Sequence, residues 1–327
     1  MRIALASLSL SIAAWAQAQG EPAEPVDSPP AEQSAAERAV PEGTSEGQRS
    51  PQGPPRFIYT VAQTMRGASA PHVDGGGDAT TATTRTEFDL VWFVSPQTRA
   101  VFQLSNELAF FEFDGAFRLD PVDGDPLSST NRQNIDVLVS HNIDRRWSVI
   151  ALGGIGLARE RNADVSDSIV WRAGVGTAYQ VTENVSLGVS LLAAAEQEGS
   201  VEILPLPAID ATIEFDERWT LRLGTLQGAR LTYQATDELA FELQSGYNER
   251  NFRLDDDGFA PGGVFQDKSI DLRLGANWKP APGLEVTGGV GSELWRRFKI
   301  SDSNGDRLRR VETDPTIVLY AGISYRF

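Results

Sequence analysis

Apolar and polar residues alternate with a period of two along most of residues 56–327. Leu239, Phe241 and Leu243, for example, fall on one face of an extended segment, while Glu242 and Gln244 fall on the other. Successive side chains of a β-strand point to opposite faces, so the pattern predicts strands with one apolar and one mixed face. Comparable alternation runs through residues 134–139, 169–180, 185–191, 270–277 and 316–327.

Turn-forming residues divide this region into long strands. Short connections fall at residues 95–98, 142–145, 181–184, 216–218, 235–238 and 279–283, and longer polar loops fall at 68–81, 114–131, 254–267 and 302–310. Short periplasmic turns alternating with long extracellular loops are typical of an antiparallel up-and-down transmembrane β-barrel. We therefore predict an all-β barrel of about 14 strands. The alternative is 12 strands, if the two short segments beside Gly228 do not both span the membrane.

The last strand ends on an aromatic residue. Tyr325 and Phe327 lie on the same apolar face of the alternating segment 316–327. This segment resembles the C-terminal strand of bacterial outer-membrane β-barrel proteins, and the stretch from Leu204 to Tyr233 is similar to an outer-membrane barrel family of unknown function. The resemblance implies localisation in the outer membrane of a Gram-negative-type bacterium. It also implies that Tyr325 and Phe327 form an assembly signal for the barrel-assembly machinery.

The N-terminal residues differ from the rest of the chain. Residues 1–18 are predicted to be a secretory signal peptide, because a basic start and an apolar stretch precede the small residues Ala16 and Ala18. Residues 19–55 are rich in Pro, Glu, Ala, Ser and Gln, and seven acids against two arginines give them a net charge of −5. We expect a disordered periplasmic linker there, followed by the barrel over residues 56–327. The chain has no cysteine, which excludes disulfides and a lipoprotein anchor.

Aromatic residues are expected to form two belts, one at each membrane interface. The belt beside the short turns contains Trp92, Trp147, Tyr179, Trp219, Tyr233, Phe241, Trp278 and Phe327. The belt beside the long loops is expected to contain Phe110, Phe111, Phe113, Trp171, Phe252, Trp295 and Phe298.

Charged residues on the strands are expected to line the lumen, because a charge facing lipid costs about 2–4 kcal/mol at the bilayer midplane. The predicted lumen-lining charges are Glu87, Asp89, Asp136, Arg172, Asp210, Glu214, Arg222, Arg230, Glu242, Asp271, Arg273, Glu285, Glu293 and Arg326. Nine acids against five arginines predict a preference for cations. The leading hypothesis is a porin-like channel for small hydrophilic solutes or cations. The alternatives are a structural barrel with a salt-bridged, closed lumen and contact-making loops, and a hydrophobic-solute transporter.

The sequence offers little for catalysis or cofactor binding. Ser140 and His141 are adjacent, so on a strand they point to opposite faces and cannot share a proton. The segment from Asp302 to Asp306 resembles the start of a calcium loop but lacks its later ligand, so we predict an ordinary hairpin turn and no metal site or cofactor. The net charge of −16 argues against nucleic acid as a partner. The expected partners are outer-membrane lipid and lipopolysaccharide, and the oligomeric state stays open.

Overall fold

The computed structural model describes residues 57–327, except residues 75, 116–126, 196, 198–200 and 225–227. The predicted signal peptide and linker lie outside the described residues. The described chain is almost entirely β-structure, and its one helix is a short 3-10 turn, η1 (Ser166–Ser168). No helix in the described part of the chain is long and apolar enough to cross a membrane.

The strands are long and follow one another in hairpins. They are β1 (Phe57–Ala68), β2 (Asp78–Ser95), β3 (Thr98–Asp114), β4 (Ser129–Asn142), β5 (Trp147–Glu160), β6 (Ile169–Thr182), β7 (Val185–Ala195) and β8 (Val201–Glu214). They continue as β9 (Trp219–Gly224), β10 (Gly228–Gln234), β11 (Leu239–Arg253), β12 (Val264–Ala281), β13 (Leu284–Ser301), β14 (Arg307–Thr313) and β15 (Thr316–Arg326).

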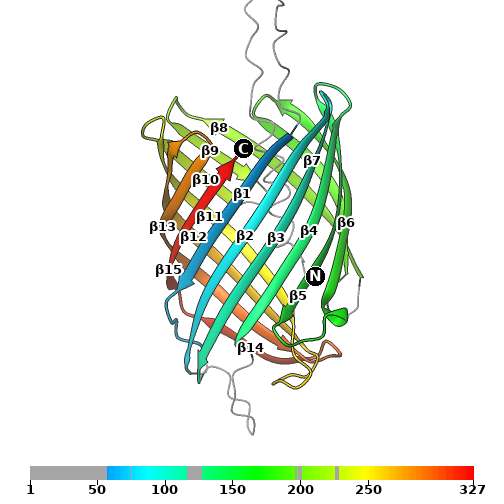
Figure 1. Ribbon diagram of the computed structural model, residues 1–327, viewed down its shortest axis with the longest axis vertical. Coiled ribbons are helices and arrows are strands. Elements are labelled where there is room, and N and C mark those ends of the chain that lie inside the picture. The colour runs from blue at the N-terminus through cyan, green and yellow to red at the C-terminus, as the bar shows by residue number, and fades with distance from the viewer. Residues whose placement is uncertain (1–56, 75, 116–126, 196, 198–200, 225–227) are drawn as a thin grey trace, which may run out of the picture.

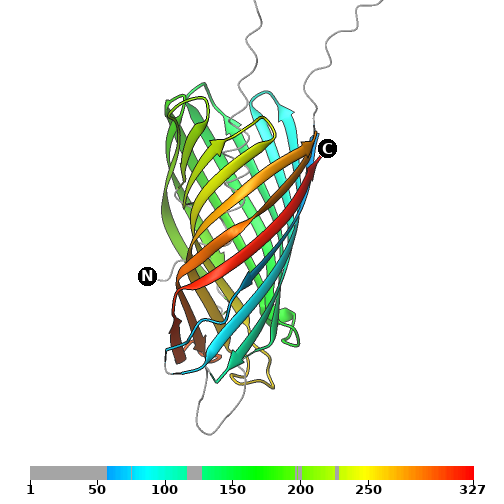
Figure 2. The ribbon, with the colours of Figure 1, turned by 90° about the vertical axis from the view of Figure 1, so that its left-hand side faces the viewer.

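The sheet closes on itself into a barrel with strongly tilted strands (Figures 1 and 2). Each strand from β1 to β13 pairs with its neighbours in the chain, β15 pairs with β1 and β13, and every pairing in this ring is antiparallel. The predicted 14 strands are confirmed, and the short strands β9 and β10 both belong to the ring. The additional strand β14 was not predicted. It pairs with the end of β13 at the long-loop rim, and it begins inside the segment 302–310 that was expected to be a loop.

The outer wall of the barrel is an apolar band. Ile203, Leu319 and Val175 are 68%, 64% and 61% exposed, far more than a soluble domain tolerates in a contiguous patch. The aromatic belt at the short-turn end is confirmed, because Trp92 and Trp278 are exposed there beside the turns. The C-terminus lies at this same end (Figure 1). An apolar band with an aromatic girdle is the surface that a transmembrane barrel presents to lipid.

Two of the short turns share the sequence Asp-x-Arg-Trp, and both form the same set of contacts within the aromatic girdle. The Asp144 carboxylate accepts hydrogen bonds from the backbone N–H groups of Arg146 (2.7 Å) and Trp147 (2.8 Å). Arg146 in turn donates to the Tyr179 hydroxyl at 3.0 Å, and the Trp147 and Tyr179 rings lie 4.9 Å apart. The second unit contains Asp216, Arg218, Trp219 and Tyr233. A turn sequence thus fixes the position of a tryptophan at the membrane interface.

Candidate functional site

The lumen brings together the charged residues of the strands. The strand registers place all fourteen predicted lumen residues on one face, the inner face of the barrel. Of these, Asp136, Arg172, Asp271 and Glu293 are buried. Glu214, Arg222 and Arg326 are exposed at or near the short-turn rim, and Glu87, Asp89, Asp210, Arg230, Glu242, Arg273 and Glu285 are partly exposed. The lumen is therefore accessible toward the short turns and filled toward the long loops.

One buried ion pair lies along the wall. Arg172 on β6 makes two hydrogen bonds to the Asp136 carboxylate on β4, and both side chains are less than 9% exposed. The intervening strand β5 carries Gly154 directly between them. A Cβ atom at this position would overlap with Asp136 Oδ1, so glycine is required for the pair to cross the strand.

A second group of charges forms a continuous chain in which arginines and acids alternate. This ion-pair chain consists of Arg85, Glu107, Arg250, Asp267, Arg296, Glu293, Arg66, Asp271 and Arg273, with successive N–O separations of 3.8, 3.2, 2.5, 2.8, 3.2, 2.6, 3.3 and 3.4 Å. Arg296, Asp267 and Asp271 are at most 1% exposed. Each buried charge thus has an oppositely charged neighbour, the condition under which burial of charge is tolerated.

The ion-pair chain crosses the lumen at a single ion pair, Arg250–Glu107. Arg250 is on β11 and Glu107 is on β3, which lie on opposite sides of the ring of strands, yet their side chains are 3.2 Å apart. The barrel is flattened nearby, because β11 also forms a parallel bridge with β5 between Arg253 and Arg159. Flattening brings side chains from opposite walls into direct contact.

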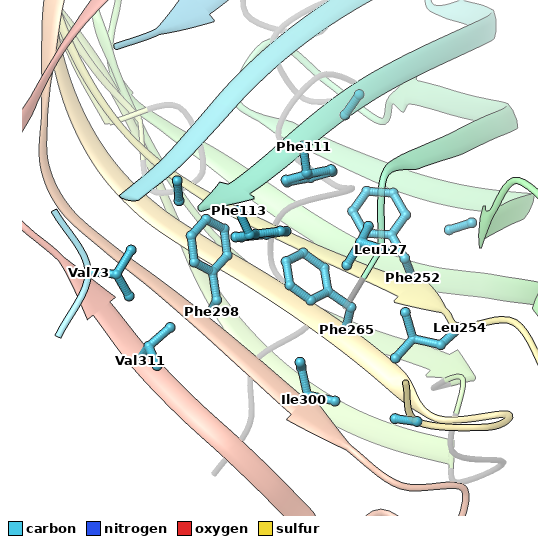
Figure 3. Close-up of a cluster of buried hydrophobic side chains, with 14 residues drawn as sticks. Val73, Phe111, Phe113, Leu127, Phe252, Leu254, Phe265, Phe298, Ile300 and Val311 are labelled. Carbon is cyan, nitrogen blue, oxygen red and sulfur yellow. The ribbon is translucent and has the colours of Figure 1, made fainter. Parts of the chain in front are cut away.

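Aromatic and aliphatic side chains fill the lumen on the long-loop side of this link (Figure 3). Phe111 and Phe113 come from β3, and they pack edge to face against Phe265 of β12 and Phe298 of β13, at ring separations of 5.4 and 5.6 Å. Phe265 and Phe298 are 0% exposed. This hydrophobic plug also contains Val73, Ala79, Ala109, Leu127, Ala158, Phe252, Leu254, Ala260, Ile300 and Val311.

The prediction of a second aromatic belt beside the long loops was wrong for the phenylalanines of the hydrophobic plug. Phe111, Phe113, Phe252 and Phe298 were expected at the lipid interface, but they point into the lumen, where each is at most 5% exposed. Phe110, by contrast, is 54% exposed on the outer wall. Adjacent residues on a strand face opposite sides, so the cluster of phenylalanines around Phe110 had to be divided between the two faces.

A β-bulge explains several residues that the sequence analysis missed. The pairing of β12 with β13 shifts between Ile270 and Asp271, which leaves Leu294 as an extra residue. Glu293 and Arg296 consequently both face inward, although they are three positions apart. An extra residue reverses the phase of the alternation, and no strong signal in the local sequence marks it. Arg296 also lies over the Phe298 ring at 4.6 Å, which joins the ion-pair chain to the plug.

The inner wall has no large excess of acids. Within the described strands, Arg66, Arg85, Arg99, Arg132, Arg250 and Arg296 also face inward, against the additional acids Glu107, Glu202 and Asp267. The predicted ratio of nine acids to five arginines therefore becomes nearly even. This removes the basis for the predicted preference for cations.

The residues considered for catalysis and metal binding have ordinary structural roles. Ser140 faces inward and accepts a hydrogen bond from Arg99 Nε at 3.0 Å, while the His141 Nδ1 atom lies 2.8 Å from the Thr98 hydroxyl on the exposed side. Asp302 accepts backbone N–H groups of its own hairpin turn, including that of Asp306 at 2.9 Å. No group of acids and histidines that would hold a metal ion occurs in the described part of the chain.

The closed antiparallel ring, the apolar outer band and the polar inner wall define a transmembrane β-barrel of the outer-membrane type. The chain belongs to the family described as "Domain of unknown function (DUF6268)", whose model matches residues 130–326. No protein of curated function matches the chain significantly in sequence.

Solved structures of outer-membrane barrels are similar in fold. The toluene transporter TodX of Pseudomonas putida is 10% identical, and the match covers 84% of this chain and 91% of that one with a TM-score of 0.45. An outer membrane channel from Pseudomonas putida F1 is 10% identical over 86% and 100% of the two chains, with a TM-score of 0.43. The porin NanC is 10% identical over 82% and 98%, with a TM-score of 0.34. At these identities and TM-scores the likeness carries no conclusion about this chain.

Proposed function

We propose that this protein is a gated outer-membrane channel for small hydrophilic solutes, and that the structure represents its closed state. The observation that carries the proposal is the division of the lumen into two parts. The half near the short turns is lined by partly exposed polar side chains, such as Glu242 and Arg230, which lie 3.9 Å apart. The other half is closed by the cross-lumen ion pair and the hydrophobic plug.

The chemistry of the closure favours a gate over a permanent seal. The ion pair that joins opposite walls within the described residues is Arg250–Glu107. Arg250 also donates to the Thr83 hydroxyl of β2 at 3.5 Å, and it keeps a second acid, Asp267, on its own side of the barrel at 2.5 Å. Breaking the Arg250–Glu107 ion pair therefore exchanges one charge-assisted hydrogen bond for water without leaving Arg250 unpaired. Such a bond is worth roughly 1.5–3 kcal/mol, so the cost of breaking this ion pair is one that solute binding or membrane voltage can supply.

Planar-bilayer recordings of the full chain test the gate. Glu107→Ala removes the cross-lumen link, whereas Asp136→Ala removes a buried pair that runs along the wall, and both variants take one acid from the inner face. We expect brief, rare openings for the wild type, an open probability at least tenfold higher for Glu107→Ala, and wild-type behaviour for Asp136→Ala. The plug is tested in the same way with Phe113→Ala, which should raise conductance further in the Glu107→Ala background.

A second candidate function follows from the same closure. A lumen filled by ion pairs and phenylalanines also suits a structural barrel whose loops bind other molecules. The gated channel is overturned, and the structural barrel is favoured, if all variants migrate as folded barrels but none conducts. A wild type that conducts continuously at the level of Glu107→Ala overturns both, because the closure would then have no effect on permeation.

We also propose that the C-terminal aromatic residues act in assembly and that residues 19–55 lie in the periplasm. Tyr325 and Phe327 pack edge to face at 4.5 Å and are 41% and 72% exposed on the outer wall, where an assembly factor can reach them. The Phe327 N–H donates to the Tyr59 carbonyl at 2.9 Å, which ties the terminus to β1 at the closing seam of the barrel. Both chain ends of the barrel lie at the short-turn end, the end that faces the periplasm in barrels of this type.

A further inference from the structure

Four uncharged polar side chains form a row across the outer wall of the barrel on strands β1–β4. The strand registers pair Gln63 with Thr86, Thr86 with Asn106, and Asn106 with Gln133, all on the outward face. Gln63, Thr86 and Gln133 are exposed there. We call these four residues the polar row, and the strands that carry them lie side by side at the front of Figure 1.

The polar row lies within the apolar band that faces lipid. Gln63 Nε2 donates to the Thr84 hydroxyl at 3.3 Å, which is only one of the hydrogen bonds that an amide can make. Lipid acyl chains neither donate nor accept hydrogen bonds, so amides at this depth are costly unless another protein group pairs with them. The next row toward the short turns is entirely apolar and contains Val61, Phe88, Leu104, Ile135 and Ile155.

A groove lies beside the polar row on the same outer wall. Its volume is about 440 Å³, and its lining includes the small residues Gly67 of β1, Ala82 of β2 and Ala321 of β15, which are adjacent strands. Met65 and Phe110 also line the groove, and they are 58% and 54% exposed. Small residues allow two membrane-embedded surfaces to approach closely, and polar side chains beside them hydrogen-bond across the contact.

We propose that the outer face of β1–β4 binds a second copy of this chain and forms a two-fold dimer in the membrane. A two-fold contact places the same surface against itself, so it requires a self-complementary face. Amides and hydroxyls both donate and accept hydrogen bonds, so the polar row of one copy can pair with that of the other without charge repulsion. Met65 and Phe110 protrude beside the groove, so each copy can insert an apolar side chain into the groove of its partner. The proposal depends on the membrane location and not on whether the lumen conducts.

Sedimentation equilibrium of the folded, full-length barrel in a mild detergent tests this interface. Gln63→Leu/Asn106→Leu removes two amides from the polar row, and leucine is favourable against lipid, so the variant should migrate as a folded barrel. Gly67→Leu fills the groove, and a Cβ at position 67 meets nothing within 4 Å. Gly153→Leu is the matched control, because Gly153 faces outward on β5 and a Cβ there also meets nothing within 4 Å. We expect both interface variants to dimerise at least tenfold more weakly and the control to dimerise like the wild type.

Cross-linking in outer membranes identifies the occupant of this face. The chain has no cysteine, so a single introduced cysteine reports on one position. A short bifunctional thiol reagent should link Thr86→Cys into dimers of this chain, but not Val175→Cys, which is 61% exposed on β6. A monomeric wild type, equal dimerisation of the two interface variants and the wild type, or equal cross-linking at both cysteines would each overturn the proposal. Cross-linking of Thr86→Cys to a different protein, or a lipid retained by a monomeric barrel, would also overturn it and would identify the other occupant.

Discussion

Replacing Gly154 by alanine tests whether the Asp136–Arg172 pair stabilises the barrel. A Cβ at position 154 overlaps with Asp136 Oδ1, whereas a Cβ at the neighbouring Gly153 meets nothing within 4 Å. Gly153 therefore supplies a matched control on the same strand, one residue away and facing outward. Any general effect of adding a methyl group to β5 should appear in both variants.

The expected magnitude follows from the burial of the pair. Asp136 and Arg172 are 8% and 7% exposed, and breaking a buried ion pair outright costs about 3–5 kcal/mol. Alanine forces the carboxylate aside without removing it, so we expect the loss of one charged hydrogen bond, about 1.5–3 kcal/mol. Gly153→Ala should be neutral or stabilising by up to about 1 kcal/mol, because alanine restricts the unfolded chain.

Urea unfolding in lipid vesicles, followed by tryptophan fluorescence and by the difference in migration between boiled and unboiled samples, measures these free energies. The same two substitutions are then repeated in an Asp136→Ala background, where the overlapping atom is absent. We expect the penalty of Gly154→Ala to disappear there, as a double-mutant cycle requires for residues that act through one contact. The reasoning is refuted if Gly154→Ala and Gly153→Ala have equal stability, or if the penalty survives without Asp136.

Three other predictions concern assembly, access and pH. Phe327→Asp should reduce the amount of barrel that migrates as folded in outer membranes while secretion across the inner membrane is unchanged; unaltered folded levels would exclude an assembly role. A cysteine at Glu242 should react with a small hydrophilic thiol reagent, and one at Phe265 should not unless the plug opens; equal labelling would contradict the closed half of the lumen. Hydrogen bonds from backbone N–H groups of its own turn lower the pKa of Asp144 below its ordinary value. The stabilisation by Asp144 should therefore be complete at neutral pH and should be lost as the pH falls from about 4 through the depressed pKa. The unfolding midpoints of wild type and Asp144→Asn should converge there, and a constant difference at all pH values would contradict this role.

The architecture of the barrel was predictable from the sequence because its signals are local. The period-two alternation, the short turns and the terminal Phe327 each depend on a few adjacent residues. Even the short strands β9 and β10 were detectable from the turn at Gly228, where φ is +77° and glycine is favoured. The strand β14 was missed because it pairs only with the end of β13 and does not belong to the ring.

The sequence by itself therefore determined the class of fold and which side chains face the lumen in regular strands, since alternation assigns each residue to a face. It did not determine what those side chains do once inside. Glu107 and Arg250 are 143 residues apart and meet only because the ring closes and flattens, which brings β3 and β11 together across the lumen. The bulge at Leu294 likewise turned Arg296 and Phe298 inward. Closure of the lumen is a property of contacts between opposite walls, and only the tertiary structure decided which residues those are.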